Sequence, residues 1–483
     1  MRGGHSWVGA SAARIAAAVQ RGDASATEVI VDHLDHARIA DRVLDLLGVL
    51  RAGAAVAEAE QVDAADQGLE SEFPLVGVPV IVAEDTPVAG VATSRHAVAP
   101  EDHEIVRRLR GAGAVVLGTG RQAGDDAGRR GRHRPGKHGD NGGRWRGPMT
   151  RNPWRGDRSP GGASVGPAAA VAAGVVPLAH ATTGVAISAA SCGLVGLAPG
   201  LDIDAVYSDD WSGEHGTIAT TVSDAALGQA VVAGRWPELL PGGRRLRVAA
   251  SVRCPMPLVG ADRATRTAVR RAARLLIGLD HDVVAAEPDY STRLVLAAGH
   301  RNVRAGQRID WRARCEHWFH RGRFDLLLQP AVAGPPPAAV PNSGDWLSSP
   351  FASARLTAYT VLWSLAGLPT MTVPMGLRPD GLPASVQLIG PPGSESLLCA
   401  VAAQLEWIAP WRRHAPGWPR PVRPFGLLMA RSADDRKRAS NEAGDPGGRR
   451  GGQEGARRRG PDDATGAEPP ADGGTGRTRL AQM

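Results

Sequence analysis

The chain has 483 residues, of which 43% are hydrophobic, and it carries a formal net charge of +7 at pH 7. This apolar content excludes a chain that is disordered throughout, and the length allows about three average domains or one large α/β domain with extensions. The most apolar run, residues 168–179, is too short to span a bilayer, since a transmembrane helix needs about 20 residues.

Helices and short apolar strands alternate along the chain. Ser25 and Glu28 form a capping box that predicts a helix with Ile30, Leu34 and Ala37 on one face. Further helices are expected at residues 104–110 and 264–277, and further strands at residues 78–82, 114–117, 283–286 and 324–328. This alternation predicts an α/β fold with a large mixed sheet that is covered by helices on both faces.

The positive charge is concentrated outside these elements. Residues 121–158 hold ten arginines and Lys137 against four aspartates, so this stretch alone accounts for +7. Its Gly/Arg-rich part, residues 121–148, is expected to form a long loop inside a single domain spanning residues 10–425. The segment 431–483 lacks Phe, Tyr and Trp, which predicts a disordered tail.

The composition of the loop bears on possible partners. A nucleic-acid-binding surface typically combines positive charge with aromatic side chains that stack on bases, and the Gly/Arg-rich loop has only one aromatic residue, Trp145. A solvated loop, or one whose sequence reflects a biased genome under relaxed constraint, is the favoured interpretation, and nucleic-acid binding is the weakest alternative.

The cysteines and the N-terminus indicate the compartment. The four cysteines lie far apart without a C-x-x-C pair, so neither a zinc site nor a disulfide framework is predicted. The first residues lack an uninterrupted apolar stretch because Arg14 breaks it, which argues against a signal peptide. We therefore expect a reduced, cytoplasmic setting with no metal and no membrane partner.

Several motifs occur in a fixed order, among them PLVGVPV at residues 74–80 and PGGASVGPAAAVA at residues 160–172. The other matching segments are residues 88–90, 106–118, 150–154, 192–197, 366–369, 380–383 and 386–390. Together they resemble the amidase signature family over most of residues 10–425. The resemblance implies that family's α/β fold, hydrolysis of a small carboxylic amide without a cofactor, and the possibility of a homodimer.

The resemblance also implies a Ser–Ser–Lys mechanism, in which a lysine acts as base through a bridging serine and a second serine attacks the carbonyl. In this chain the position of the family's lysine is occupied by Ala83, and the position of the bridging serine is occupied by Ala163. The nucleophile loop is about three residues short, with Gly184 the nearest equivalent of the nucleophile. The same pattern assigns substrate contacts to two glycines and two threonines: Gly161, Gly162, Thr182 and Thr183.

No other lysine can replace the lost base. The chain has only two lysines, Lys137 in the predicted loop and Lys437 in the predicted tail. Arginine stays protonated up to a pH of about 12 and cannot act as the base. The sequence therefore predicts a family member that is impaired in the family's own chemistry.

Several side chains near these positions leave two alternatives open. Ser164 is interpreted as a helix N-cap and Ser188 as a structural replacement for a family proline. Cys192 is expected to be an inert buried thiol, and Glu84 with Asp85 to be a solvated or hydrogen-bonded strand end. His180, too, is expected to be structural. The alternatives are a non-catalytic binding or scaffold protein, and an enzyme rebuilt around Ser164, Cys192 or Glu84 and Asp85.

Overall fold

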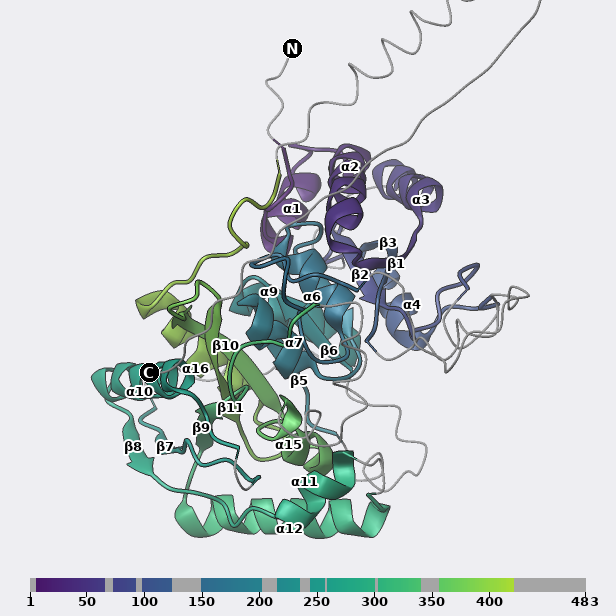
Figure 1. The fold of residues 1–483 in the computed structure, drawn as a ribbon. Helices are drawn as coiled ribbons and strands as arrows, with labels where there is room; N and C mark the ends of the chain where they lie inside the picture. The colour runs from purple at the N-terminus through teal and green to yellow at the C-terminus, as the bar shows by residue number, and fades with distance from the viewer. Residues whose placement is uncertain are drawn as a thin grey trace, which may run out of the picture. The chain divides into compact units, whose positions relative to one another are not determined.

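An eleven-stranded mixed sheet is the framework of the computed structural model (Figure 1). The structure describes residues 6–65, 73–92, 98–123, 149–201, 215–234, 244–256, 259–299, 303–339 and 356–420. All of these residues belong to one compact unit. Residues 124–148 of the predicted loop and the predicted tail at residues 431–483 lie outside the described residues.

The strands run in the order β1-β3-β2-β4-β6-β5-β10-β11-β9-β7-β8 across the sheet. Their bounds are Leu47–Leu50 (β1), Pro79–Ala83 (β2), Val115–Gly120 (β3), Leu178–Ala181 (β4), Val195–Ala198 (β5), Gly216–Ala219 (β6), Arg247–Ala250 (β7), Asp282–Ala285 (β8), Leu326–Pro330 (β9), Thr370–Leu377 (β10) and Pro383–Ile389 (β11). Strand β2 pairs in parallel with β3 and β4, whereas β4, β6, β5, β10, β11 and β9 pair antiparallel in succession. The prediction of a mixed sheet is confirmed.

Helices cover both faces of this sheet. Their bounds are Ala12–Gln20 (α1), Ala26–Leu44 (α2), Ala52–Ala64 (α3), Glu104–Gly111 (α4), Val165–Ala172 (α6), Val185–Cys192 (α7), Val222–Ala233 (α9), Arg263–Gly278 (α10), Thr292–Gly299 (α11), Ala305–Gly322 (α12), Val361–Ala366 (α15) and Glu395–Ile408 (α16). None of the helices in the described ranges is long and apolar enough to cross a membrane.

Two neighbouring residues of β6 show which helices lie on which face. A Cβ on Gly216 would stand 3.1 Å from the Val185 side chain of α7. The next residue, Thr217, points the other way and donates a hydrogen bond from its hydroxyl to the carbonyl oxygen of Ala225 in α9 (2.9 Å). Because successive side chains of a strand point to opposite faces, α7 and α9 cover opposite faces of the sheet.

The predicted elements are present with small shifts at their ends. The Ser25 hydroxyl caps α2 by accepting a hydrogen bond from the Glu28 amide (3.0 Å), and Ile30, Leu34 and Ala37 are buried as predicted. The predicted strand 324–328 begins two residues later, at Leu326. The carboxylate of Asp325, just before the strand, accepts hydrogen bonds from Arg244 and the Arg247 amide.

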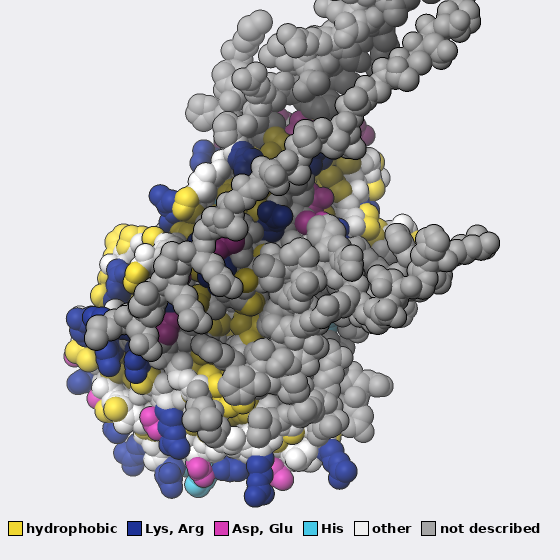
Figure 2. Space-filling model, viewed as in Figure 1, with side chains coloured by type: hydrophobic (Ala, Val, Ile, Leu, Met, Phe, Trp, Pro, Cys, Tyr) yellow, Lys and Arg dark blue, Asp and Glu magenta, His cyan; other side chains and the backbone are white. Residues whose placement is uncertain are grey.

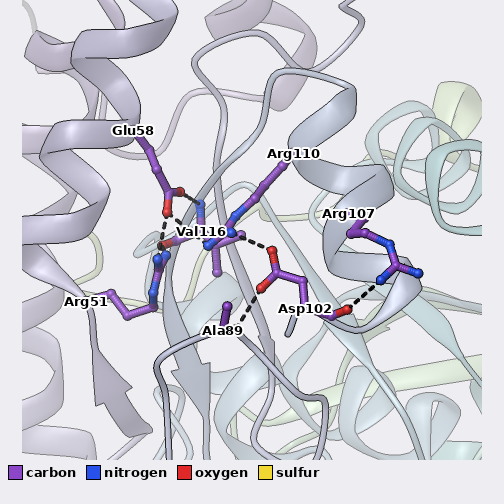
Figure 3. A network of polar contacts seen from close by, with 7 residues as sticks. All are labelled: Arg51, Glu58, Ala89, Asp102, Arg107, Arg110 and Val116. Atoms are coloured by element: carbon purple, nitrogen blue, oxygen red, sulfur yellow. Dashed lines mark hydrogen bonds and ion pairs between the residues drawn. The ribbon is translucent and has the colours of Figure 1, made fainter. Parts of the chain in front are cut away.

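A polar network holds the segment that follows β2 (Figure 3). Glu58 of α3 accepts hydrogen bonds from Arg51 (2.7 Å) and Arg110 (3.0 Å). Arg110 of α4 also pairs with Asp102 (2.5 Å), whose carboxylate accepts the amide of Ala89 (2.7 Å). The network therefore joins α3, α4 and the chain between β2 and α4.

Two buried histidines join α2 to the turn after α6. The Nδ1 of His33 donates to the carbonyl oxygen of Val175, and the Nε2 of His36 donates to that of Ala173, both at 2.8 Å. Burial lowers the pKa of His33 from its ordinary value of 6.5 to about 4 and also lowers the pKa of His36. Both rings are therefore neutral in the folded protein at pH 7.

We predict that the protein loses stability as the pH falls from 6.5 towards 4. Over this range the unfolded chain binds a proton at His33 that the folded protein does not bind, so His33 alone costs about 2 kcal/mol between pH 7 and pH 5. Urea denaturation at the two pH values measures this loss. His33→Asn, which keeps a donor but does not titrate, should lose about 2 kcal/mol less than the wild type, whereas exposed His317→Asn should behave as the wild type does.

Candidate active site

A glycine loop lies against the first turns of α7. Gly161 and Gly162 both have a left-handed backbone, with φ of 72° and 69°. A Cβ on Gly162 would stand 2.5 Å from the Ser188 Oγ, a distance that no side chain tolerates without rearrangement. Ser188 in turn donates a hydrogen bond to the carbonyl oxygen of Gly161 (2.6 Å). Glycine is therefore required at residue 162, and Ser188 fastens the loop to α7.

The three positions assigned to the Ser–Ser–Lys residues lie at neighbouring backbone segments. Gly184 is the N-cap of α7 with φ of 68°, and a Cβ on it would stand 3.1 Å from the Ala163 amide nitrogen. Ala83 ends β2, is fully buried, and pairs with Gly120, which packs against the Pro167 ring of α6. Ala83 therefore faces α6, whose N-terminus follows Ala163 directly.

Ser164 occupies the N-cap position of α6, but its side chain does not cap the helix. Its Oγ donates to the carbonyl oxygen of Thr183 instead (2.9 Å). The predicted capping bond is wrong, because the chain after β4 passes close enough for its carbonyl to compete with the helix amides. Ser164 joins the loop before α6 to the loop before α7.

Asp85 and Thr182 form a polar group after the parallel strands β2 and β4. The Thr182 hydroxyl lies 3.1 Å from both carboxylate oxygens of Asp85 and donates to them. Gln122, two residues after β3, donates its side-chain amide to Asp85 (2.6 Å) and to the Thr182 oxygen (2.5 Å). Thr182 is buried, so its hydroxyl is turned towards Asp85 rather than towards an open site.

Glu84 is buried beside the edge strand β1. A Cβ on Gly48 of β1 would stand 3.0 Å from the Glu84 carboxyl carbon, and only 7% of Glu84 is exposed. The sequence left open whether Glu84 is solvated or hydrogen-bonded. A solvated side chain is the wrong alternative, because β1 covers Glu84.

His180 lies on the opposite face of the sheet from Ala83. It pairs with Thr217, whose hydroxyl reaches α9, so the His180 ring also points to the α9 face. There it hydrogen-bonds His215 (Nε2 to Nδ1, 3.2 Å), which stacks on His103 with ring centroids 5.5 Å apart. Burial holds the pKa of His180 well below its ordinary value and lowers that of His215 to about 4. These rings therefore cannot replace the missing base at the Ala83 position.

Cys192 ends α7 and is buried. Burial raises the pKa of its thiol, so the nucleophilic thiolate is not formed at neutral pH. Its carbonyl oxygen accepts a hydrogen bond from the Trp154 indole (2.7 Å). Cys192 therefore acts as a packed side chain.

Two contributors to this region were missed from the sequence. Gln122 was assigned to the Gly/Arg-rich loop, although its place directly after β3 could have signalled a position near the ends of β2 and β4. His215 gave no signal, because its partner is 35 residues away in the chain. Within the described ranges, no three His, Cys, Asp or Glu side chains are arranged to hold a metal ion.

The model of the amidase family matches residues 28–307 and 296–399. A Mycobacterium tuberculosis protein named as an amidase, AmiB2, is 32% identical over 477 residues, which cover 84% of this chain and 98% of the relative. The 6-aminohexanoate-cyclic-dimer hydrolase of Paenarthrobacter ureafaciens is 30% identical, over 73% of this chain and 88% of that protein.

Solved structures have the same fold. A 6-aminohexanoate cyclic dimer hydrolase superposes with a TM-score of 0.66 at 25% identity, covering 84% of this chain and 98% of that chain. A bacterial aryl acylamidase of the amidase signature family gives a TM-score of 0.66 at 20% identity, over 85% and 99%. The second similarity supports the fold alone.

We predict that Ser188→Ala destabilises the protein by about 1–3 kcal/mol, because the buried Gly161 carbonyl loses its donor. Urea denaturation measures the change. Ser223→Ala, at an exposed serine of α9, removes the same hydroxyl and should change the stability by less than about 0.5 kcal/mol. Equal effects of the two variants would contradict the fastening role of Ser188.

Proposed function

The chain belongs to the amidase family, and we propose that it keeps the frame of the family's site without the family's hydrolytic mechanism. By homology its family hydrolyses carbon–nitrogen bonds. The proposal assigns this chain a non-catalytic binding or scaffold role for a small carboxylic amide. We also propose that the chain consists of one domain at residues 10–425 and a tail at residues 431–483.

One observation carries the proposal: the hydroxyls of Ser164 and Ser188 are both donated to backbone carbonyls. A serine becomes a nucleophile when a base accepts its hydroxyl proton. A peptide carbonyl is no base at neutral pH, so in this arrangement neither oxygen is activated.

The base position supports the same conclusion. Ala83 presents a methyl group towards α6, and the backbone around it is closely packed by Gly120 and Pro167. Ala83 is fully buried, so a lysine there would carry its charge into the interior and would need a partner for it. Both lysines of the chain, Lys137 and Lys437, lie outside the described residues.

What the site retains is the glycine loop and the helix start facing it. The left-handed Gly161, Gly162 and Gly184 hold the loop before α6 against the N-terminus of α7. Backbone amides at such a place suit the carbonyl oxygen of an amide, which needs a donor but no catalytic group. Four free cysteines support a reduced, cytoplasmic setting as part of the proposal.

A second candidate is hydrolysis by rebuilt chemistry, favoured by the contact between Thr182 and Asp85. Thr182 is a hydroxyl of this region that donates to a carboxylate, as a nucleophile donates to its base. Its burial and its further bond to Gln122 make it the weaker candidate, because a substrate carbonyl must reach the oxygen.

We predict that purified full-length protein does not hydrolyse benzamide, acetanilide or 4-nitrophenyl acetate above the rate in buffer. The reason is that, among the described residues, the Ser164 and Ser188 hydroxyls are donated to backbone carbonyls and no base accepts either proton. Product release by chromatography or absorbance measures the rate, with Ser164→Ala and Thr182→Val as comparisons. Turnover abolished by Ser164→Ala would overturn the proposal, and turnover abolished by Thr182→Val would establish the second candidate.

Binding without turnover is the positive half of the proposal. We expect benzamide to bind the wild type in isothermal titration calorimetry. Ala163→Phe, which adds a large side chain next to Gly184, should bind it at least tenfold more weakly. Ala54→Phe, at an exposed alanine of α3, is the matched control and should bind as the wild type does. Equal binding by both variants would place the ligand elsewhere and contradict the proposal.

A further inference from the structure

Helix α10 carries a stripe of arginines on its exposed side. Arg263, Arg266, Arg270 and Arg274 are spaced by three, four and four residues, which places them on one face of the helix. All four are exposed, and no Asp or Glu occurs between Arg263 and Gly278. At a rise of about 1.5 Å per residue, the stripe is about 16 Å long.

The stripe is not neutralised by its surroundings. Asp262, the N-cap of α10, is paired with Arg378 of the segment after β10. Arg274 donates to the backbone oxygen of Arg270 rather than to a carboxylate. Within the described ranges, none of the four guanidinium groups lies within ion-pair distance of an Asp or Glu. The arginines therefore present an uncompensated positive surface.

Exposed apolar side chains lie beside this stripe. Ile277 continues the same face of α10 and is 56% exposed. On α16, Trp407 is 87% exposed and Ile408 is 38% exposed. The two helices are joined where His281, just after α10, hydrogen-bonds Gln404 of α16 (2.9 Å). Figure 2 shows hydrophobic side chains over the region of α16 beside Lys and Arg side chains over α10.

The far end of β10 extends the apolar surface. Leu377 is 60% exposed and lies two residues after Met375, whose carbonyl oxygen accepts a hydrogen bond from Arg271 of α10 (3.1 Å). The arginine stripe and these four side chains form the surface that we call the α10–α16 surface: Arg263, Arg266, Arg270, Arg274, Ile277, Leu377, Trp407 and Ile408.

Although the sequence predicts no membrane partner, we propose that the α10–α16 surface docks on the surface of an anionic lipid bilayer. Guanidinium groups bind phosphate oxygens through paired hydrogen bonds, and each arginine near an anionic membrane strengthens binding about fivefold. Tryptophan and isoleucine enter the boundary between head groups and acyl chains, where a nearby basic face holds them. Contacts of this kind give peripheral binding without a membrane-spanning segment.

Other occupants fit the surface less well. A nucleic acid would pair with the arginines but would leave Ile277, Leu377 and Ile408 without apolar contacts. A second copy docked about a twofold axis through the stripe would set arginines against arginines. A lipid surface satisfies both the charge and the apolar side chains.

Vesicle sedimentation of the full-length protein tests the proposal. We expect binding to vesicles of phosphatidylcholine with 30% phosphatidylglycerol, at least tenfold weaker binding to pure phosphatidylcholine, and weakening as salt rises. Arg270→Glu/Arg274→Glu should lower binding to the anionic vesicles at least twentyfold. Arg42→Glu/Arg293→Glu, which makes the same charge change at exposed sites on α2 and α11, should lower it less than threefold. Circular dichroism confirms that each variant is folded.

The fluorescence of Trp407 supplies a second readout. Brominated phosphatidylglycerol should quench the wild-type fluorescence more than that of Trp407→Phe, because Trp407 enters the lipid. Equal loss of binding in the two arginine pairs would overturn the proposal, as would equal binding to neutral vesicles. Preferential binding to a 20-nucleotide DNA through Arg270 and Arg274, or a dimer in light scattering that Trp407→Ala dissociates, would overturn it too.

Discussion

The alternation of side chains along β2 and β4 determines which groups can meet at the site. Ala83 and His180 belong to neighbouring regions of adjacent parallel strands, yet their side chains point to opposite faces of the sheet. The α6 face receives a methyl group, and the α9 face receives the imidazole. A sheet covered by helices on both faces keeps these faces apart, so proximity in the strands does not let His180 replace a base at Ala83.

Because Ala83 supplies no base, the hydroxyls around the site bond to other nearby acceptors. Ser164 donates to Thr183, Ser188 donates to Gly161, and Thr182 donates to Asp85. Each bond satisfies a buried polar group that would otherwise cost about 1–3 kcal/mol. The same bonds stabilise the loops before α6 and α7, so the frame of the site persists without its chemistry. The sequence motifs that identify the family are largely the motifs of this frame.

Local patterns were enough to predict the elements, because caps and apolar periodicity act over a few residues. The Ser25 cap and the buried face of α2 followed directly from residues 25–37. Contacts across the chain could not be derived in this way. Ser164 prefers a carbonyl 19 residues away to its own helix amides, and Gln122 reaches Thr182 over 60 residues. These partners depend on how the loops after β2, β3 and β4 converge in the folded protein. A local sequence pattern does not contain that information.

The net charge of the sequence likewise does not predict how charge is distributed over the folded surface. The formal charge of +7 is matched by the Gly/Arg-rich stretch at residues 121–158, which leaves the rest of the chain close to neutral. Near neutrality of a folded body nevertheless says nothing about the distribution of charge among its faces. Acidic side chains such as Glu58 and Asp102 are paired inside networks (Figure 3). Arg270 and Arg274, in contrast, stand on an exposed helix face without such partners among the described residues. A surface can therefore be strongly basic on a body whose net charge is small, because the acidic side chains that balance the sum lie elsewhere on the body.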